Sequence, residues 1–277
     1  MAAETFWVDG VVNTEVPPDD RGLCLADGAF ETLRVESGVI SCKRRHAKRL
    51  GRGLEVLNFP EPNPTALKRV DEAEAILNNT IPQATGTLRL TLTRGSGPRG
   101  YKVPERQKPR CILRFSPGLA NFDALAPLTV SRVRWSSQPF FRGCKLLART
   151  EQVVALEEAR GRGFSDAIMC DASGSWVSTT SGNLFLRVGD RFITPPVDEV
   201  GIAGTRREAI LDQWAEILGY QVSIRKISSD DIASAQEAWC CNSVVGIRRI
   251  VAVDQFTFTE MTASDALSAC IHSEKAS

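Results

Sequence analysis

The chain has 277 residues and a mass of 30.3 kDa, long enough to bury one large hydrophobic core or two smaller ones. Its 34 Lys and Arg residues nearly balance 33 Asp and Glu residues, so the net charge is +1. The long-range positive field that attracts nucleic acid or an anionic membrane is therefore not expected. We predict a globular protein that binds neither.

Histidine and cysteine usage argues against a metal site. His46 and His272 are the only histidines, and the eight cysteines contain no Cys-x-x-Cys pair of the kind that structural zinc sites use. The chain does not open on a basic segment followed by an apolar run, and no apolar stretch approaches the ~20 residues needed to cross a bilayer. We expect a cytoplasmic protein whose cysteines, including the adjacent Cys240 and Cys241, are reduced.

Residues 1–116 predict a small α+β lobe. Alternating apolar residues flank turns at Asp9-Gly10 and Ser37-Gly38, which indicates two β-hairpins. Leucines at helical spacing predict a helix over 43–57, and a similar pattern predicts another over 66–77. Strands are expected to resume at TLRLTLTR and RCILRFS. Antiparallel strands combined with two helices are typical of the α+β class.

Residues 117–128 predict a connection between lobes, because they contain two prolines, a glycine and no clear period. A larger mixed α/β lobe is expected over 129–277. Its predicted helices cover 144–160, 206–218 and 263–271, and short alternating segments between them predict strands.

Lys145 is the only lysine between Lys108 and Lys226, and it lies among apolar residues in GCKLLA. A desolvated lysine has a lowered pKa, and its neutral amine can bond covalently to a carbonyl group. A lysine whose ammonium group reaches solvent fits the same pattern. Its neighbours alone favour the solvated alternative.

Two segments have features of anion sites. RGSGPRGY, residues 94–101, places three glycines and two arginines beside Tyr101, although a flexible hairpin tip has the same composition. GIAGTRREAI, residues 201–210, places Gly204 and Thr205 before an amphipathic helix, whose positive N-terminal end favours a phosphate. Thr205 as a simple N-cap is the alternative.

Three more polar residues are candidates for the same anion or a nearby ligand. Arg49, in RRHAKRL, could bind the anion or belong to a solvated helix face. Asn242 and Ser243 follow the end of a predicted strand, a common place for groups that contact a ligand.

Seven ordered motifs resemble one enzyme group, the fold-type IV pyridoxal-phosphate (PLP) enzymes: DGAFETLRV, HAKRL, RGSGPRGY, GCKLLARTEQV, WVSTTSGNLF, GIAGTRR and CNS. The resemblance extends from Phe6 to Val253. It implies an α+β, two-lobed fold like that of D-amino-acid aminotransferase, PLP as cofactor, and a homodimer. RGSGPRGY and the lysine motif resemble the aminodeoxychorismate lyase branch most. That branch implies elimination of pyruvate from aminodeoxychorismate to give p-aminobenzoate, a step of folate synthesis.

The resemblance assigns roles to individual residues. Lys145 matches the lysine that binds PLP covalently, and we expect it to act then as a general base. Thr32 matches a position on the substrate side, where we expect it to help donate a proton to the leaving group. The implied cofactor contacts are Arg49, Ser178, Thr205, Arg206, Asn242 and Ser243. The residues implied to line the substrate side are Phe30, Arg99 and Tyr101, with Arg99 as the partner of a carboxylate.

Two positions depart from the family pattern. Ala148 replaces an asparagine that is usual in the lyase motif, and Ser178 replaces the glutamate that usually pairs with the pyridine nitrogen. A carboxylate keeps that nitrogen protonated, whereas a serine supplies no charge. Elimination from aminodeoxychorismate has an additional driving force, because the ring becomes aromatic. Our hypothesis is that Ser178 suits a lyase better than a transaminase. The alternatives are a D-amino-acid or branched-chain aminotransferase and a non-catalytic PLP-binding protein.

Overall fold

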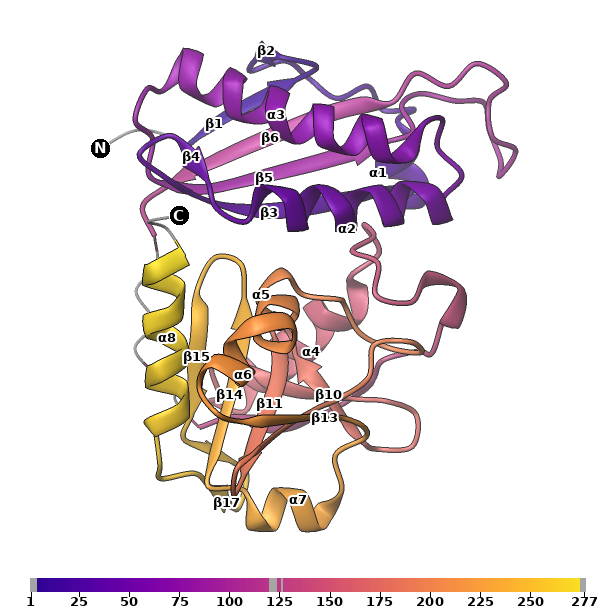
Figure 1. Cartoon of the computed structure of the whole chain (residues 1–277). Coiled ribbons are helices and arrows are strands. Elements are labelled where there is room, and N and C mark those ends of the chain that lie inside the picture. The colour runs from indigo at the N-terminus through magenta and orange to yellow at the C-terminus, as the bar shows by residue number, and fades with distance from the viewer. Residues whose placement is uncertain (1–3, 120–123, 126, 275–277) are drawn as a thin grey trace. The chain divides into compact units, whose positions relative to one another are not determined.

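The computed structural model describes residues 4–119, 124–125 and 127–274, and the chain divides into two compact units (Figure 1). The first contains Met1–Leu119 and Cys144–Ala148, and the second contains Ala120–Gly143 and Arg149–Ser277. The predicted connection over 117–128 lies outside the described residues at 120–123 and 126, and strand β7 covers Ala124–Leu125.

The first unit contains an antiparallel six-stranded sheet with the order β2-β1-β6-β5-β3-β4. Both predicted hairpins are confirmed: Trp7 pairs with Val12, and Val35 pairs with Ile40. Asp9 and Gly10 have φ values of 50° and 84°, as a two-residue hairpin turn requires. The strands are β1 (Thr5–Val8), β2 (Val11–Val12), β3 (Gly28–Glu36), β4 (Val39–Ile40), β5 (Gly86–Thr93) and β6 (Arg110–Pro117).

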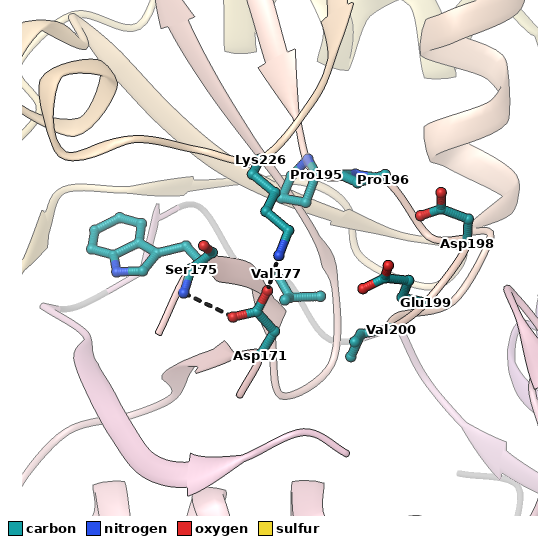
Figure 2. A pocket seen from close by; sticks show the side chains of 10 residues that line it. Asp171, Ser175, Val177, Pro195, Pro196, Asp198, Glu199, Val200 and Lys226 are labelled. Carbon is teal, nitrogen blue, oxygen red and sulfur yellow. Dashed lines mark hydrogen bonds and ion pairs between the residues drawn. The ribbon is translucent and has the colours of Figure 1, made fainter. Parts of the chain in front are cut away.

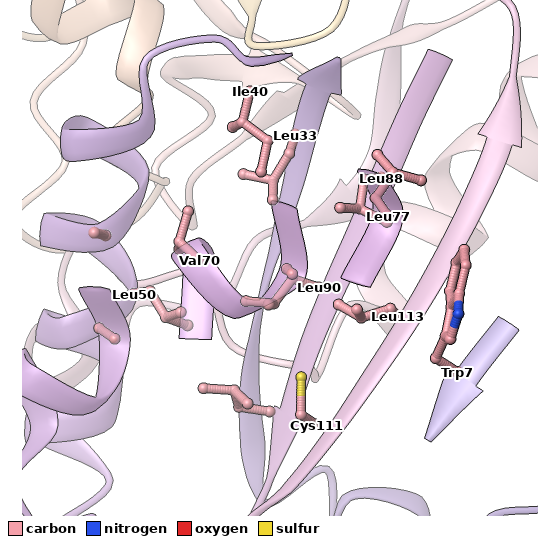
Figure 3. Packing of buried hydrophobic residues seen from close by; sticks show 14 of the residues in the cluster. Trp7, Leu33, Ile40, Leu50, Val70, Leu77, Leu88, Leu90, Cys111 and Leu113 are labelled. Atoms are coloured by element: carbon pink, nitrogen blue, oxygen red, sulfur yellow. The ribbon is translucent and has the colours of Figure 1, made fainter. Parts of the chain in front are cut away.

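Helices α2 (Lys43–Val56) and α3 (Pro62–Thr80) cover one face of this sheet and confirm the two predicted helices. Leu50 and Leu77 on the helices pack in one buried cluster with Leu33 and Leu90 on the strands (Figure 3). Residues 31, 33 and 35 of β3 face these helices, because successive strand residues point to opposite sides. Residues 30, 32 and 34 therefore lie on the other face of the sheet.

A short helix that the sequence did not predict, α1 (Arg21–Leu25), precedes β3. The Asp20 side chain caps it by accepting a hydrogen bond from the Gly22 N–H, at 2.8 Å. Five residues are too few to show a helical period, so only the cap could have indicated this helix.

The second unit contains a nine-stranded mixed sheet in which β7-β15-β14-β11-β10-β9-β8 are neighbours, and β12 pairs with both β11 and β13. The predicted strands of this lobe are present. They are β8 (Thr129–Arg134), β9 (Ala167–Cys170), β10 (Trp176–Thr179), β11 (Asn183–Val188), β12 (Arg191–Thr194), β13 (Gln221–Ile224), β14 (Glu237–Asn242) and β15 (Gly246–Ile250). Strands β16 (Ala252–Val253) and β17 (Phe256–Thr257) pair separately.

Apolar residues pack on both faces of this second sheet. Cys240 and Cys241 are adjacent on β14, and each belongs to a different buried cluster, so they point to opposite faces. The helices are η1 (Pro139–Phe141), α4 (Thr150–Gly161), α5 (Thr205–Ala209), a π-helical turn (Ile210–Trp214), α6 (Ala215–Ile217), α7 (Ser229–Ser234) and α8 (Thr262–Glu274). Among the described residues, no helix is long and apolar enough to cross a membrane.

The prediction of a helix over 144–160 is wrong for its first six residues. Helix α4 begins at Thr150, and residues 145–147 instead pair with the start of β3. The segment Cys144–Ala148 therefore belongs to the first unit, whereas we predicted that Lys145 would lie in the lobe over 129–277. Apolar residues that fill a sheet edge and apolar residues of a helix look alike over so short a stretch.

Candidate active site

Lys145 is held at the edge of the first unit's sheet by backbone hydrogen bonds. The Phe30 N–H donates to the Lys145 carbonyl at 3.0 Å, and the Leu147 N–H donates to the Gly28 carbonyl at 3.1 Å. Gly28 allows this close approach, because a Cβ there would lie 2.2 Å from the Leu92 carbonyl oxygen and 2.9 Å from Leu147. Two ladder bonds thus fix the backbone that carries the Lys145 side chain.

Two cations lie over the ring of Phe30, which is buried on β3. Lys145 Nζ is 4.5 Å from the ring centre, and the guanidinium carbon of Arg89 is 3.8 Å from it. Such contacts contribute about 0.5–2 kcal/mol each. Thr32, two residues along the same face, pairs in register with Arg89 on β5. Phe30, Thr32 and Lys145, all predicted site residues, are therefore brought together.

Arg89 was not among the predicted site residues. Burial lowers its pKa, and the charge of Arg114 lowers it further. Within the described ranges, no carboxylate lies at ion-pair distance from Arg89. The alternation in TLRLTLTR could have indicated it, because Leu88 and Leu90 face the core and Arg89 must face the opposite side. A half-buried guanidinium of this kind is suited to a carboxylate of a ligand.

Arg49 lies in a buried cluster of three charged or polar groups on the helix side of the sheet. Its Nε donates to Glu31 Oε1 at 2.8 Å, and its Nη2 donates to Oε2. His46, one helical turn earlier on α2, contacts Glu31 Oε2 through Nδ1 at 2.7 Å. Glu31 and His46 are fully buried, and Arg49 is 8% exposed. Neither Glu31 nor His46 was singled out from the sequence.

The pKa values of this cluster follow from burial and from the neighbouring charges. Burial alone would raise the pKa of Glu31, but Arg49 and His46 lower it to about 2. Burial is the largest effect on the pKa of His46 and lowers it, against the opposing effect of Glu31, and the charges of Arg49 and Lys145 lower it further. A neutral His46 must carry its proton on Nδ1 in order to donate to Glu31. The Nε2 atom is then an acceptor, and it has no hydrogen-bond partner among the described residues.

In the second unit, the turn before α5 has the features of a phosphate site. Gly204 is the N-cap, and a Cβ there would lie 1.9 Å from Asn183 Oδ1. Asn183 in turn donates to the Ile202 carbonyl at 2.7 Å and holds the turn. The Thr205 hydroxyl is buried and has no hydrogen-bond partner among the described residues. An unsatisfied buried hydroxyl at the start of a helical run over 205–217 fits an anion such as the PLP phosphate.

The other predicted cofactor residues of the second unit are Arg206, Ser178, Asn242 and Ser243, and their side chains have different contacts. Arg206 is 1% exposed, and its guanidinium lies 5.8 Å from the ring centre of Trp214. Ser178 is buried on β10, and its hydroxyl donates to the Thr179 carbonyl at 2.7 Å. Asn242 Oδ1 accepts from the N–H groups of residues 244 and 245, which closes the turn that contains Ser243. Asn242 therefore shapes this turn through its side chain.

Arg99 and Tyr101 lie in the connection between β5 and β6, in the first unit. Both side chains are exposed, and Tyr101 is 88% exposed. They are not brought against Lys145 by any contact within the described part of the unit. Ala148, at the end of the lysine segment, is also exposed.

Comparison with known proteins agrees with this geometry. The sequence profile of the family "Amino-transferase class IV" matches residues 28–253. The chain belongs to this family. A relative named aminodeoxychorismate lyase, from Vibrio harveyi, is 31% identical over 87% of the chain and 89% of its own length. The crystal structure of 4-amino-4-deoxychorismate lyase from Pseudomonas aeruginosa has a TM-score of 0.84, is 31% identical, and covers 97% and 98% of the two chains.

The predicted family, fold type and α+β class are thus confirmed for this class IV chain. Another relative, from Mycobacterium tuberculosis, is named bifunctional aminodeoxychorismate lyase / D-amino acid transaminase. It is 24% identical over 85% of both chains. Lyases and transaminases are therefore both found among the relatives.

A separate pocket of about 170 Å³ lies in the second unit of this class IV chain (Figure 2). It is lined by Asp198 and Glu199, and by Asp171 with its ion-pair partner Lys226 at 2.9 Å. Three carboxylates against one ammonium group give the pocket a negative charge, which opposes binding of a phosphate. None of the predicted site residues lines it.

Replacing Glu31 with Gln is expected to lower the free energy of unfolding by roughly 3 kcal/mol at pH 7, because Arg49 loses its buried anionic partner. The folded-state pKa of Glu31 is about 2 against an ordinary 4.5, so the stabilisation is present above pH 4.5 and is lost as the pH falls toward 2. The difference in unfolding free energy between the wild type and Glu31→Gln should therefore become smaller as the pH falls. Urea unfolding at pH 7 and at about pH 3.5 measures it.

Glu36→Gln is the matched control, because Glu36 lies on the same strand and pairs with Arg34 at a less buried position. We expect it to cost less than about 1 kcal/mol. An equal loss of unfolding free energy in both variants would contradict a stabilising buried ion pair between Glu31 and Arg49. So would a difference between Glu31→Gln and the wild type that grows as the pH falls.

Proposed function

We propose that the chain is a PLP-dependent aminodeoxychorismate lyase of the cytoplasm, which eliminates pyruvate from 4-amino-4-deoxychorismate and releases p-aminobenzoate for folate synthesis. The observation that carries the proposal is the arrangement around Phe30, where the Lys145 amine and the Arg89 guanidinium lie over one ring. It combines a group that can bond to PLP with a group suited to a substrate carboxylate. The two relatives at 31% identity, both named as this lyase, support this activity.

Each unit, taken by itself, has features that fit a phosphate group. Arg49, kept in place by Glu31, and the turn at Gly204 with the free Thr205 hydroxyl fit the cofactor phosphate. Bound PLP supplies an electron sink, which makes the proton on the amine-bearing carbon of the substrate acidic. Arg206, Asn242 and Ser243 are the further contacts that we propose on the second unit.

The proton transfers fall to side chains near Phe30. Lys145 takes the proton from the amine-bearing carbon of the substrate, while the bond from the ring to the oxygen of the enolpyruvyl group breaks. The departing group needs one proton to become pyruvate. Thr32, on the same sheet face as Phe30, is the proposed donor, and Arg89 and Arg99 orient the carboxylates of the substrate.

Ser178 favours elimination over transamination. Its hydroxyl proton is directed to the Thr179 carbonyl, so the side chain offers neither a negative charge nor a donor to a pyridine nitrogen. The nearby carboxylate of Asp166 accepts hydrogen bonds from Thr180 and Ser181 and holds their loop. A D-amino-acid transaminase activity is the second candidate function, and it is favoured by the bifunctional relative.

A homodimer and a reducing compartment belong to the same proposal. Leu23 and Leu25 on α1, outside the proposed substrate contacts, are large apolar side chains with 69% and 39% exposure. An exposed set of this kind is typical of a surface that a second subunit covers. All eight cysteines are free thiols, which is consistent with the cytoplasm.

The purified chain loaded with PLP is expected to release p-aminobenzoate and pyruvate in equal amounts from aminodeoxychorismate. Lys145→Ala should lower kcat by at least about 10³-fold, because it removes both the covalent anchor and the base. Fluorescence of p-aminobenzoate and a coupled pyruvate assay measure the two products.

Lys226→Ala is the matched control for this assay, because Lys226 pairs with Asp171 in the second unit and lies outside the proposed site. It should retain activity within about twofold of the wild type. No product from the PLP-loaded wild type, or full activity in Lys145→Ala, would refute the lyase assignment.

With D-alanine or L-leucine as the only substrate, conversion of the bound cofactor to its amine form should be at least about 100-fold slower than lyase turnover, because Ser178 supplies no charge to the pyridine nitrogen. Stopped-flow absorbance records the cofactor spectrum. Rapid and complete conversion by either amino acid would show that Ser178 does not suppress transamination.

A further inference from the structure

The connection between β5 and β6, residues 94–109, is long for a hairpin, whose connections usually contain about 2–5 residues. It carries Arg99 and Tyr101, two of the proposed substrate residues, and both of their side chains are exposed. Exposed loops of this length are flexible unless their backbone is held by other parts of the molecule.

Arg21, on α1, holds the backbone of this connection at three consecutive residues. Its Nη1 donates to the carbonyl oxygens of Gly100 at 3.1 Å and Lys102 at 3.3 Å, and its Nη2 donates to that of Tyr101 at 3.3 Å. Arg21 is 4% exposed. A guanidinium presents its donors in a rigid planar fork, so one buried group can fix several carbonyls together.

Asp27 joins this guanidinium to the strand that carries Phe30. Its carboxylate accepts from Arg21 Nε at 2.8 Å and from Arg94 Nε and Nη2 at 2.8 and 2.9 Å. Burial alone would raise the pKa of Asp27, but the hydrogen bonds from Arg94 and Arg21 hold it below its ordinary value. An ionised Asp27 therefore bridges both arginines directly before β3 begins at Gly28.

The connection also packs directly on the stem of Arg21. A Cβ at Gly97 would lie 2.8 Å from Arg21 Cδ and 3.1 Å from Pro104 Cγ. Arg21 is further tied to the start of the connection, because its N–H donates to the Gly95 carbonyl at 2.9 Å. The backbone around residues 95–104 is thus folded over one arginine, while the side chains of Arg99 and Tyr101 point to solvent.

We propose that Arg21 is a positioning residue for substrate binding: it fixes the backbone from which Arg99 and Tyr101 project. This rests on the proposed function, which makes those two side chains contacts of the substrate. Preorganised contacts bind with a smaller entropic cost, so loss of Arg21 acts on substrate affinity. The proton transfer at Lys145 does not involve the connection, so KM should change far more than kcat.

The test uses the full-length, PLP-loaded chain with Arg21→Gln and Arg21→Lys. Limited digestion with trypsin, followed by mass spectrometry, reports cleavage after Arg99, Lys102 and Arg106, and steady-state assays give KM and kcat for aminodeoxychorismate. For Arg21→Gln we expect cleavage at these sites at least about tenfold faster, KM raised about tenfold, and kcat within about twofold of the wild type. Arg21→Lys, which keeps the charge but loses the fork, should lie between.

Arg187→Gln is the matched control, because Arg187 is also buried and ion-paired, with Glu237 and Glu260, but lies in the second unit. In the Arg187→Gln variant, trypsin should cleave the connection between β5 and β6 at the wild-type rate. Wild-type cleavage or wild-type KM in Arg21→Gln would overturn the proposal, as would equally fast cleavage in Arg187→Gln. If Arg21→Gln does not fold, the same comparisons apply to Arg21→Lys.

Failure of the proposed function has a different signature. The wild type would then release no p-aminobenzoate. The digestion experiment needs no substrate, so it would still show whether Arg21 holds the connection.

Discussion

The pairing of residues 145–147 with the first residues of β3 is the constraint on which the proposed chemistry depends. It places the Lys145 side chain over Phe30, whose neighbour Glu31 points to the other side of the same strand and binds Arg49. One strand therefore organises the amine that would bind PLP and the guanidinium that would bind its phosphate. The glycine at position 28 permits the pairing, because a side chain there would collide with the neighbouring strand and with Leu147.

Arg49, Arg21 and Arg89 of the first unit are buried or half-buried, and each has different partners. The partners indicate a different role for each arginine. Arg49 is neutralised by the carboxylate of Glu31, and Arg21 is shared between Asp27 and three backbone carbonyls. Arg89 has only the ring of Phe30 and no carboxylate within the described residues. A cation that is half removed from water without an anion is energetically unfavourable unless a ligand supplies one. On this basis we propose Arg89 for a substrate carboxylate, Arg49 for the cofactor phosphate, and Arg21 as a positioning residue.

The sequence predicted the strands, the two helices over 43–57 and 66–77, and the family, because long periodic segments and ordered motifs carry strong signals. It could not show that the segment with Lys145 is extended, since apolar neighbours fit a helix and a sheet edge equally well. Glu31, His46 and Arg21 were missed for another reason. Their importance comes from contacts between residues distant in the chain, such as Arg21 with residues 100–102, which local patterns do not contain. Arg89 could have been predicted as a site residue from strand alternation alone.

The proposed chemistry depends most directly on Lys145 as the residue to which the cofactor bonds. Reduction of the PLP-loaded protein with borohydride, followed by proteolysis and mass spectrometry, locates the covalently attached pyridoxyl group. We expect a single modified peptide that carries the group on Lys145. Modification of another lysine, or no stable modification of a protein that has bound PLP, would contradict it.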